Sequence, residues 1–231
     1  MTESLRNFSG MWLATSYSRK SWPAVISIMA GKVVDLSSQL DSIPEFCVVD
    51  TNVLISLFVP ATSPTNARQR SQSQALRQHL EQEDKGGFVT PTTVAEIAHL
   101  FVKLEFTREL KNNLVKHEAD LRNRFPGKAR FDWLDLCKVY PRPFEAAAKS
   151  LQTACSQIRT SFVFLEPFDL SPNAPGTHQF TDLAAAIKRY RMDSNDASIL
   201  IEARRAGISA IVSHDGDLRR ASKDFDVYTW L

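Results

Sequence analysis

The chain has 231 residues, 43% of them hydrophobic, and its 28 Lys and Arg residues against 26 Asp and Glu residues leave a net charge of +2. It is long enough to bury the core of one large domain, and its mild charge permits a nucleic-acid partner without arguing for one. The three cysteines have no paired spacing, which speaks against a disulfide framework and a zinc site, and the longest apolar run, residues 22–30, is too short for a membrane helix. We expect a cytoplasmic protein that does not enter a membrane.

Residues 1–45 follow no sustained hydrophobic period, apart from apolar patches at 24–29 and 32–36. We expect them to form an N-terminal extension of unknown role, packed on the main domain or partly disordered. The main domain is expected over residues 46–231.

Its first element is an apolar, valine-rich run at residues 46–49, which ends abruptly in Asp50, Thr51 and Asn52. The run predicts a buried strand, and apolar residues at helical spacing over 53–58 predict a helix directly after it. Asp50 then lies at the carboxyl end of a strand, where open α/β sheets bind ligands. An Asp between a strand and a helix is also a good N-cap, so this position alone does not decide between the two roles.

A second junction of the same kind follows an amphipathic helix predicted over residues 65–83. A short strand at 88–90 leads through Pro91 into a helix with Glu96 in its first turns. Thr93 and Glu96 have the spacing of a capping box, in which the Glu only bonds back to the cap. The alternative is that Glu96 shares a site with Asp50.

Residues 105–157 are helical in period and charged, with proline-containing breaks at 126–127 and 141–143. We predict a helical insertion at about residues 105–160, whose cations mostly form a solvated face. A third strand is expected at 161–165 and a loop at 170–177.

The last part of the chain contains two more acidic junctions. A helix at 181–190 precedes Asp193 and Asp196, which stand one turn apart on a helix that Gly207 ends. An apolar strand at 210–213 then stops at Asp215, which repeats the arrangement of Asp50, and residues 225–230 predict a final edge strand. Alternating strands and helices predict an α/β fold with a mostly parallel central sheet and helices on both faces.

Four acids, Asp50, Glu96, Asp196 and Asp215, lie at strand ends or in first helical turns, so one parallel sheet can bring them to one edge. Carboxylates gathered in a cleft raise one another's pKa unless a cation neutralises them. Oxygen ligands favour hard divalent cations such as Mg²⁺ or Mn²⁺, and no His or Cys cluster competes for a softer metal. We therefore expect one or two metal ions, with the lone His214 as a bystander.

The sequence resembles a PIN domain over residues 46–229, with the helical insertion as a gap. The resemblance rests on four motifs in order: VVDTN at 48–52, PTTVAE at 91–96, DSNDA at 193–197 and IVSHDGD at 211–217. It implies a Rossmann-like α/β/α nuclease fold, dependence on Mg²⁺ or Mn²⁺, and hydrolysis of phosphodiester bonds in single-stranded or structured RNA. Many small bacterial members are VapC-type toxins neutralised by an antitoxin, but the wide gap between the second and third motifs and the N-terminal extension depart from those compact proteins.

By this resemblance the four family acids, expected to hold the metal and to carry catalysis, are Asp50, Glu96, Asp196 and Asp215. Ser213 occupies the family's Thr or Ser position and would bond a carboxylate or a water on the metal. Asn52 would orient Asp50 or brace the turn, and Asp193 and Asp217 are auxiliary metal candidates. An acidic pocket repels RNA, so cations beside the motifs are expected to bind it: Arg189, Arg191, Arg219 and Arg220.

The expected function is therefore that of a Mg²⁺- or Mn²⁺-dependent ribonuclease that cleaves RNA. Three further points are left open: whether it is the toxin of a toxin–antitoxin pair, whether it binds an antitoxin protein, and whether it forms a homodimer. Three interpretations compete with it. The chain could be a PIN-fold module that binds RNA or a protein partner with little or no catalytic activity. It could be a phosphatase with an aspartyl nucleophile, although that class needs an acid where Asn52 stands. It could also be a plain α/β domain whose acids are only helix caps.

Overall fold

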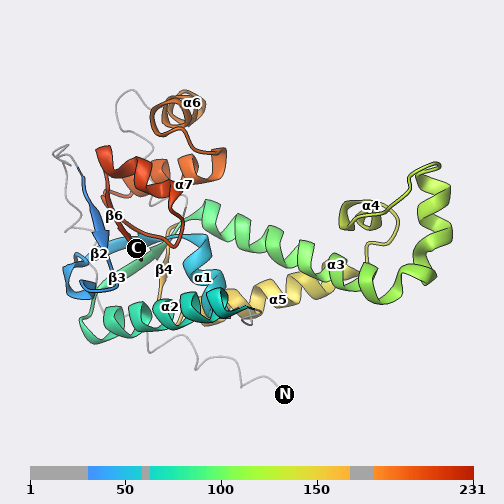
Figure 1. Ribbon diagram of the computed structural model, residues 1–231, viewed down its shortest axis with the longest axis horizontal. Coiled ribbons are helices and arrows are strands. Elements are labelled where there is room, and N and C mark those ends of the chain that lie inside the picture. The colour runs from blue at the N-terminus through green and yellow to red at the C-terminus, as the bar shows by residue number, and fades with distance from the viewer. Residues whose placement is uncertain (1–30, 59–62, 167–178) are drawn as a thin grey trace, which may run out of the picture.

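A single six-stranded sheet forms the centre of the protein (Figure 1). The computed structural model describes residues 31–58, 63–166 and 179–231. All strand pairs are parallel and the spatial order is β1-β6-β5-β2-β3-β4. The strands are β1 Val33–Asp35, β2 Phe46–Val49, β3 Gly86–Val89, β4 Val163–Phe164, β5 Ala210–Val212 and β6 Asp226–Thr229.

Helices cover both faces of this sheet, as the alternation of elements predicted. Alternate strand residues point to opposite faces: Val49 of β2 packs in a core with side chains of α1, α2 and α5, whereas Val48 packs in a second core with α6 and α7. The predicted parallel α/β fold is confirmed. The helices are α1 Thr51–Phe58, α2 Pro64–Gln82, α3 Pro91–Arg124, α4 Trp133–Cys137, α5 Pro143–Ile158, α6 Gln179–Tyr190 and α7 Ser194–Arg205, with short 3₁₀ turns η2 Leu40–Ser42 and η3 Asp217–Lys223.

The prediction that residues 225–230 form an edge strand is wrong. β6 pairs with β5 on one side and with β1 on the other, in the register Val34 to Tyr228. β1 comes from the segment expected as an N-terminal extension, and its Val34, together with Leu36 directly after the strand, is buried in the core that contains Val49. Most of that expected extension, residues 1–30 with the patch at 24–29, lies outside the described residues, as does the expected loop at 170–177.

Helices α3, α4 and α5 cover most of the segment expected as a helical insertion, and they form an arm that extends away from the sheet (Figure 1). α3 and α5 run together along it, and α4 packs against α3. The backbone of α3 kinks at Asn113, where φ is −131°. The arm has its own small core of Phe106, Leu121 and Leu136, which explains how a segment so far from the sheet keeps its shape.

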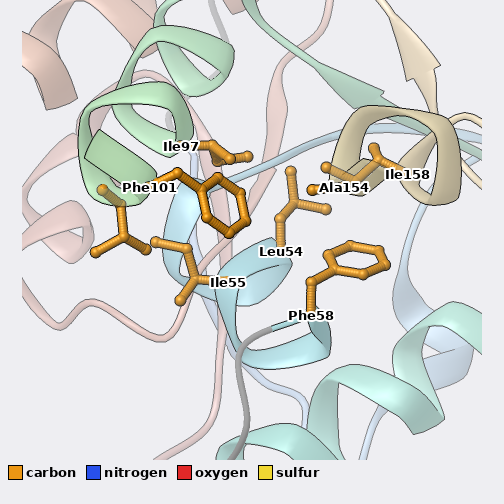
Figure 2. A pocket seen from close by; sticks show the side chains of 8 residues that line it. Leu54, Ile55, Phe58, Ile97, Phe101, Ala154 and Ile158 are labelled. Atoms are coloured by element: carbon orange, nitrogen blue, oxygen red, sulfur yellow. The ribbon is translucent and has the colours of Figure 1, made fainter. Parts of the chain in front are cut away.

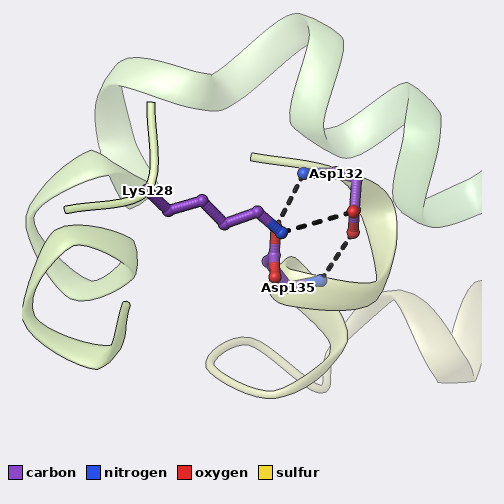
Figure 3. A network of polar contacts seen from close by, with 3 residues as sticks. All are labelled: Lys128, Asp132 and Asp135. Carbon is purple, nitrogen blue, oxygen red and sulfur yellow. Dashed lines mark hydrogen bonds and ion pairs between the residues drawn. The ribbon is translucent and has the colours of Figure 1, made fainter. Parts of the chain in front are cut away.

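A polar cluster holds the tip of the arm together (Figure 3). Asp132 caps α4, and Asp135 accepts a hydrogen bond back from the Asp132 N–H at 2.9 Å, which makes a capping box. The Lys128 ammonium lies between both carboxylates and lowers the pKa of the buried Asp135 against the raising effect of its burial. The charge of Asp135 is thus satisfied by structural contacts.

The base of the arm is joined to the sheet by apolar packing (Figure 2). Side chains of α1, α3 and α5 converge there around a gap of about 10 Å³; those labelled are Leu54, Ile55, Phe58, Ile97, Phe101, Ala154 and Ile158. Tight packing of this kind leaves the helices little freedom to shift. It therefore fixes α3 relative to α1, and with them Glu96, which lies in α3, and Asp50, which directly precedes α1. None of the helices within the described part of the chain is long and apolar enough to cross a membrane.

Candidate active site

Neighbouring strands bring Asp50 and Asp215 to one edge of the sheet. Val49 of β2 pairs with Val212 of β5, so the residues that follow these strands lie side by side. The Ser213 hydroxyl donates a hydrogen bond to Asp50 Oδ2 at 2.6 Å and accepts one from the Asp215 N–H at 2.8 Å. One buried hydroxyl therefore orients one acid and the backbone of the other.

Asn52 closes the same turn. Its Oδ1 accepts a hydrogen bond from the His214 N–H at 3.0 Å, and its Nδ2 donates to Ser213 Oγ at 3.3 Å. The structure thus places Asn52 as the brace between the two strand ends. The His214 ring points elsewhere: its Nε2 lies 2.8 Å from Ser73 Oγ, it stacks on Trp230, and burial lowers its pKa to about 4.

Glu96 does not belong to a capping box. α3 begins at Pro91, and its N-cap is Thr90, whose Oγ1 accepts a hydrogen bond from the Thr93 N–H at 3.2 Å. Glu96 instead lies in the second turn and accepts a hydrogen bond from Thr51 Oγ1, the residue that follows Asp50. The capping interpretation fails because the helix starts three residues earlier than that interpretation required.

Contacts between α3 and α7 bring in the remaining acids. Glu202 of α7 accepts hydrogen bonds from the N–H and the hydroxyl of Thr92, at 3.1 and 2.8 Å. Asp193 is the N-cap of α7, and its carboxylate accepts hydrogen bonds from the N–H groups of Asn195 and Asp196 at 2.9 and 3.0 Å. Asp196 stands in the first turn of the same helix.

These elements enclose a cleft of about 610 Å³ at the carboxyl edge of the sheet. Four expected acids and the auxiliary Asp193 line it, whereas Asp217 does not and instead forms an exposed ion pair with Arg220 at 2.8 Å. The polar and charged residues of the lining are Asp50, Thr51, Asn52, Thr92, Glu96, His99, Lys103, Asp193, Asn195, Asp196, Ser198 and Asp215.

Two carboxylates of the cleft have raised pKa values. Burial is the largest cause for Asp50, and the charges of Glu96 and Asp215 add to it, so that its pKa rises from 3.8 to about 6 in spite of its hydrogen bonds. Burial and then the charge of Asp193, with smaller effects of the other acids, raise the pKa of Asp196 from 3.8 to about 7. The cleft therefore holds negative charge that the surrounding protein does not neutralise.

The chemistry of this lining fits a hard divalent cation, because its carboxylates offer only oxygen donors and repel one another. In the described parts of the chain, no three His, Cys, Asp or Glu side chains lie close enough together to form a ready-made metal site. Side-chain movement must then accompany binding, and the half-buried residues Asp196 and Asp215 have room for it.

The arginines expected to bind RNA lie outside the cleft lining. Arg189 donates two hydrogen bonds to Asp224, both 2.6 Å long, and Arg220 donates to the Arg191 carbonyl oxygen at 2.6 Å. The sequence reading missed His99 and Lys103, which do line the cleft. They follow Glu96 by three and seven residues in the same helix, which places all three on one helical face, and this spacing could have indicated them.

A parallel α/β sheet with an acidic cleft at the carboxyl ends of its strands defines a Rossmann-like fold with a site suited to cations. The family model described as PIN domain matches residues 47–217, most of the chain, and the protein belongs to this family. PIN domains are generally nucleases that act on nucleic acid and typically use divalent metal ions. Among curated proteins, a search finds no match to the sequence.

Proposed function

We propose that this protein is an endoribonuclease that hydrolyses RNA phosphodiester bonds with Mg²⁺ or Mn²⁺. The observation that carries the proposal is the convergence of the four acids on one cleft, where two of them have raised pKa values. If each carboxylate served only as a helix cap, the N–H groups of its own helix would stabilise its charge, independently of the other acids. These acids act on one another across four separate elements, which favours a shared cation.

In this proposal Asp50, Glu96, Asp196 and Asp215 hold one or two ions. A bound divalent cation supplies Lewis-acid activation of a water for attack on phosphorus and stabilises negative charge on the leaving oxygen. The protein's part is to orient the carboxylates. Ser213 holds Asp50, while Thr51 holds Glu96, so both carboxylates are positioned before the substrate arrives.

The test uses the full chain and a labelled single-stranded RNA. We expect cleavage with Mn²⁺ or Mg²⁺, none with excess chelator, and none with Asp50→Asn or Asp215→Asn. Asp217→Asn is the matched control, because this acid is exposed outside the cleft lining and its loss should leave cleavage intact.

Metal binding gives a readout independent of activity. Mn²⁺ at about one hundred times its dissociation constant should stabilise the wild-type protein by roughly 2.7 kcal/mol, and less in either cleft variant. A wild-type protein whose thermal midpoint ignores Mn²⁺, or a cleft variant that cleaves normally, would contradict the proposal. Binding of RNA and Mn²⁺ without turnover would instead favour the non-catalytic binding module.

A further inference from the structure

Among the described residues that line the acidic cleft, Lys103 is the only Lys or Arg. It is exposed, and it makes no hydrogen bond or ion pair with any residue that the structure describes. Long cationic side chains at a protein surface commonly pair with nearby acids, yet this one lies in a cleft with five carboxylates and contacts none of them. It is therefore available to a ligand.

Lys103 continues a stripe along α3 that begins at a proposed metal ligand. Glu96, His99 and Lys103 are spaced by three and four residues, which places them on one face of the helix. At a rise of 1.5 Å per residue, Lys103 lies about 10 Å along the axis from Glu96. The stripe leads out of the acidic end of the cleft toward the arm.

The arm contacts this stripe at its middle position. The ring of Trp133, in α4, lies 5.5 Å from the ring of the exposed His99 in an edge-to-face arrangement. Such contacts hold aromatic rings in a preferred orientation. The inserted α4 thus fixes the direction of an imidazole that lines the cleft.

We propose that the Glu96–His99–Lys103 stripe binds one strand of RNA next to the scissile phosphate, with the Lys103 ammonium on a neighbouring phosphate and the His99 ring stacked on a base. This inference rests on the proposed function, since it places the strand by the proposed metal ligand Glu96. It also gives the insertion a role, because Trp133 acts as a positioning residue for His99. A duplex would keep its bases stacked inside, so a single strand is the form that fits.

Physical chemistry explains why such a track is needed. An acidic cleft repels a polyanion even with a metal bound, so an uncompensated cation close to the acids is required to hold the strand there. An aromatic ring adds affinity that depends little on sequence, because every base has a π-face. Together they predict binding of single-stranded RNA with weak sequence preference.

Binding is tested in the full chain carrying Asp215→Asn, so that cleavage does not consume the probe. Fluorescence anisotropy follows a labelled oligouridylate of about 12 nucleotides, with Mn²⁺ present, over a range of salt concentrations. Lys103→Ala should weaken binding and lower the slope of log K against log salt by about 0.7, the value for one phosphate contact in a single strand. Lys111→Ala removes an exposed lysine of the same helix outside the cleft lining and should change neither.

His99 is tested with two variants. His99→Ala should weaken binding at least about 5-fold without changing the salt slope, and His99→Phe should restore much of the loss, because a phenyl ring still stacks. A duplex with the same sequence as the probe should bind more weakly than the single strand.

The inference is overturned if the parent protein binds no RNA, if Lys103→Ala matches Lys111→Ala, if His99→Ala binds like the parent, or if duplex binds as tightly as single strand. Cleavage by the protein with Asp215 intact is measured separately. RNA binding with the expected variant effects but no cleavage would sink the proposed function and leave this subsite standing. Cleavage of RNA, with binding unchanged in the Lys103 and His99 variants, would support the proposed function and overturn this subsite.

Discussion

Replacing Asp196 by Asn should stabilise the metal-free protein above neutral pH. The pKa of Asp196 is raised from 3.8 to about 7, first by its burial and then by the charge of Asp193. The folded protein therefore keeps this proton at pH values where the unfolded chain has lost it. Stability from this group is highest below about pH 4 and falls as the pH rises to about 7, and an uncharged Asn escapes that loss.

The size of the effect follows from the shift. A rise from 3.8 to about 7 is roughly three pKa units, which corresponds to an upper limit of about 4 kcal/mol at 1.36 kcal/mol per unit. Asp196 is only half-buried, and solvent screening reduces such interactions. We therefore expect a gain of roughly 2 kcal/mol at pH 8 and less than half of that at pH 5.

Urea unfolding at pH 5 and pH 8, with chelator present, measures this difference. Asp217→Asn removes an exposed carboxylate outside the cleft lining and should shift stability by no more than about 0.5 kcal/mol at either pH. Mn²⁺ should reverse the order of stability, because only the wild-type protein keeps all four acids. A variant no more stable than wild type at pH 8, or a gain that is the same at both pH values, would refute the electrostatic reasoning.

Three further changes test how the cleft and the arm are held. Ser213→Ala removes a hydrogen-bond donor to the buried Asp50, so the free energy of unfolding measured with urea should fall by about 1–3 kcal/mol. The same change should raise the pKa of Asp50 above about 6 and move the acidic limb of the pH–rate profile to higher pH. Glu202→Ala leaves both Thr92 donors without a protein partner and should lower stability by about 1.5–3 kcal/mol and weaken Mn²⁺ binding in calorimetry, whereas Glu202→Gln, which keeps an acceptor, should lose less. Asp135→Ala removes the acceptor shared by a lysine and the capping box, so limited proteolysis should cut faster within residues 125–140 while the thermal midpoint of the sheet core changes little. Equal proteolysis of this variant and the wild type would mean that the polar cluster does not hold the tip.

The local sequence pattern was sufficient to predict the junctions at which an acid follows a buried strand. The apolar runs before Asp50 and Asp215 must be buried, and in a parallel α/β sheet buried strands end at the same edge, so the convergence of these two acids followed from the sequence with little else. The acid-bearing turns at Glu96 and Asp196 were found in the same way. Both are local features, since a hydrophobic period reports which face of an element is covered.

Only the tertiary structure decided which polar groups are free and which are already paired. Glu96 contacts Thr51 from a distant part of the chain, Arg189 is bound by Asp224, and Lys103 is the one Lys or Arg among the described residues of the cleft lining. The position of β6 inside the sheet likewise depended on pairing with β1. The periodicity of the sequence does not encode such long-range contacts, because strand order and helix packing set them. The sequence by itself determined that Asp50 and Asp215 follow buried strands, and the tertiary structure decided which residues surround these acids.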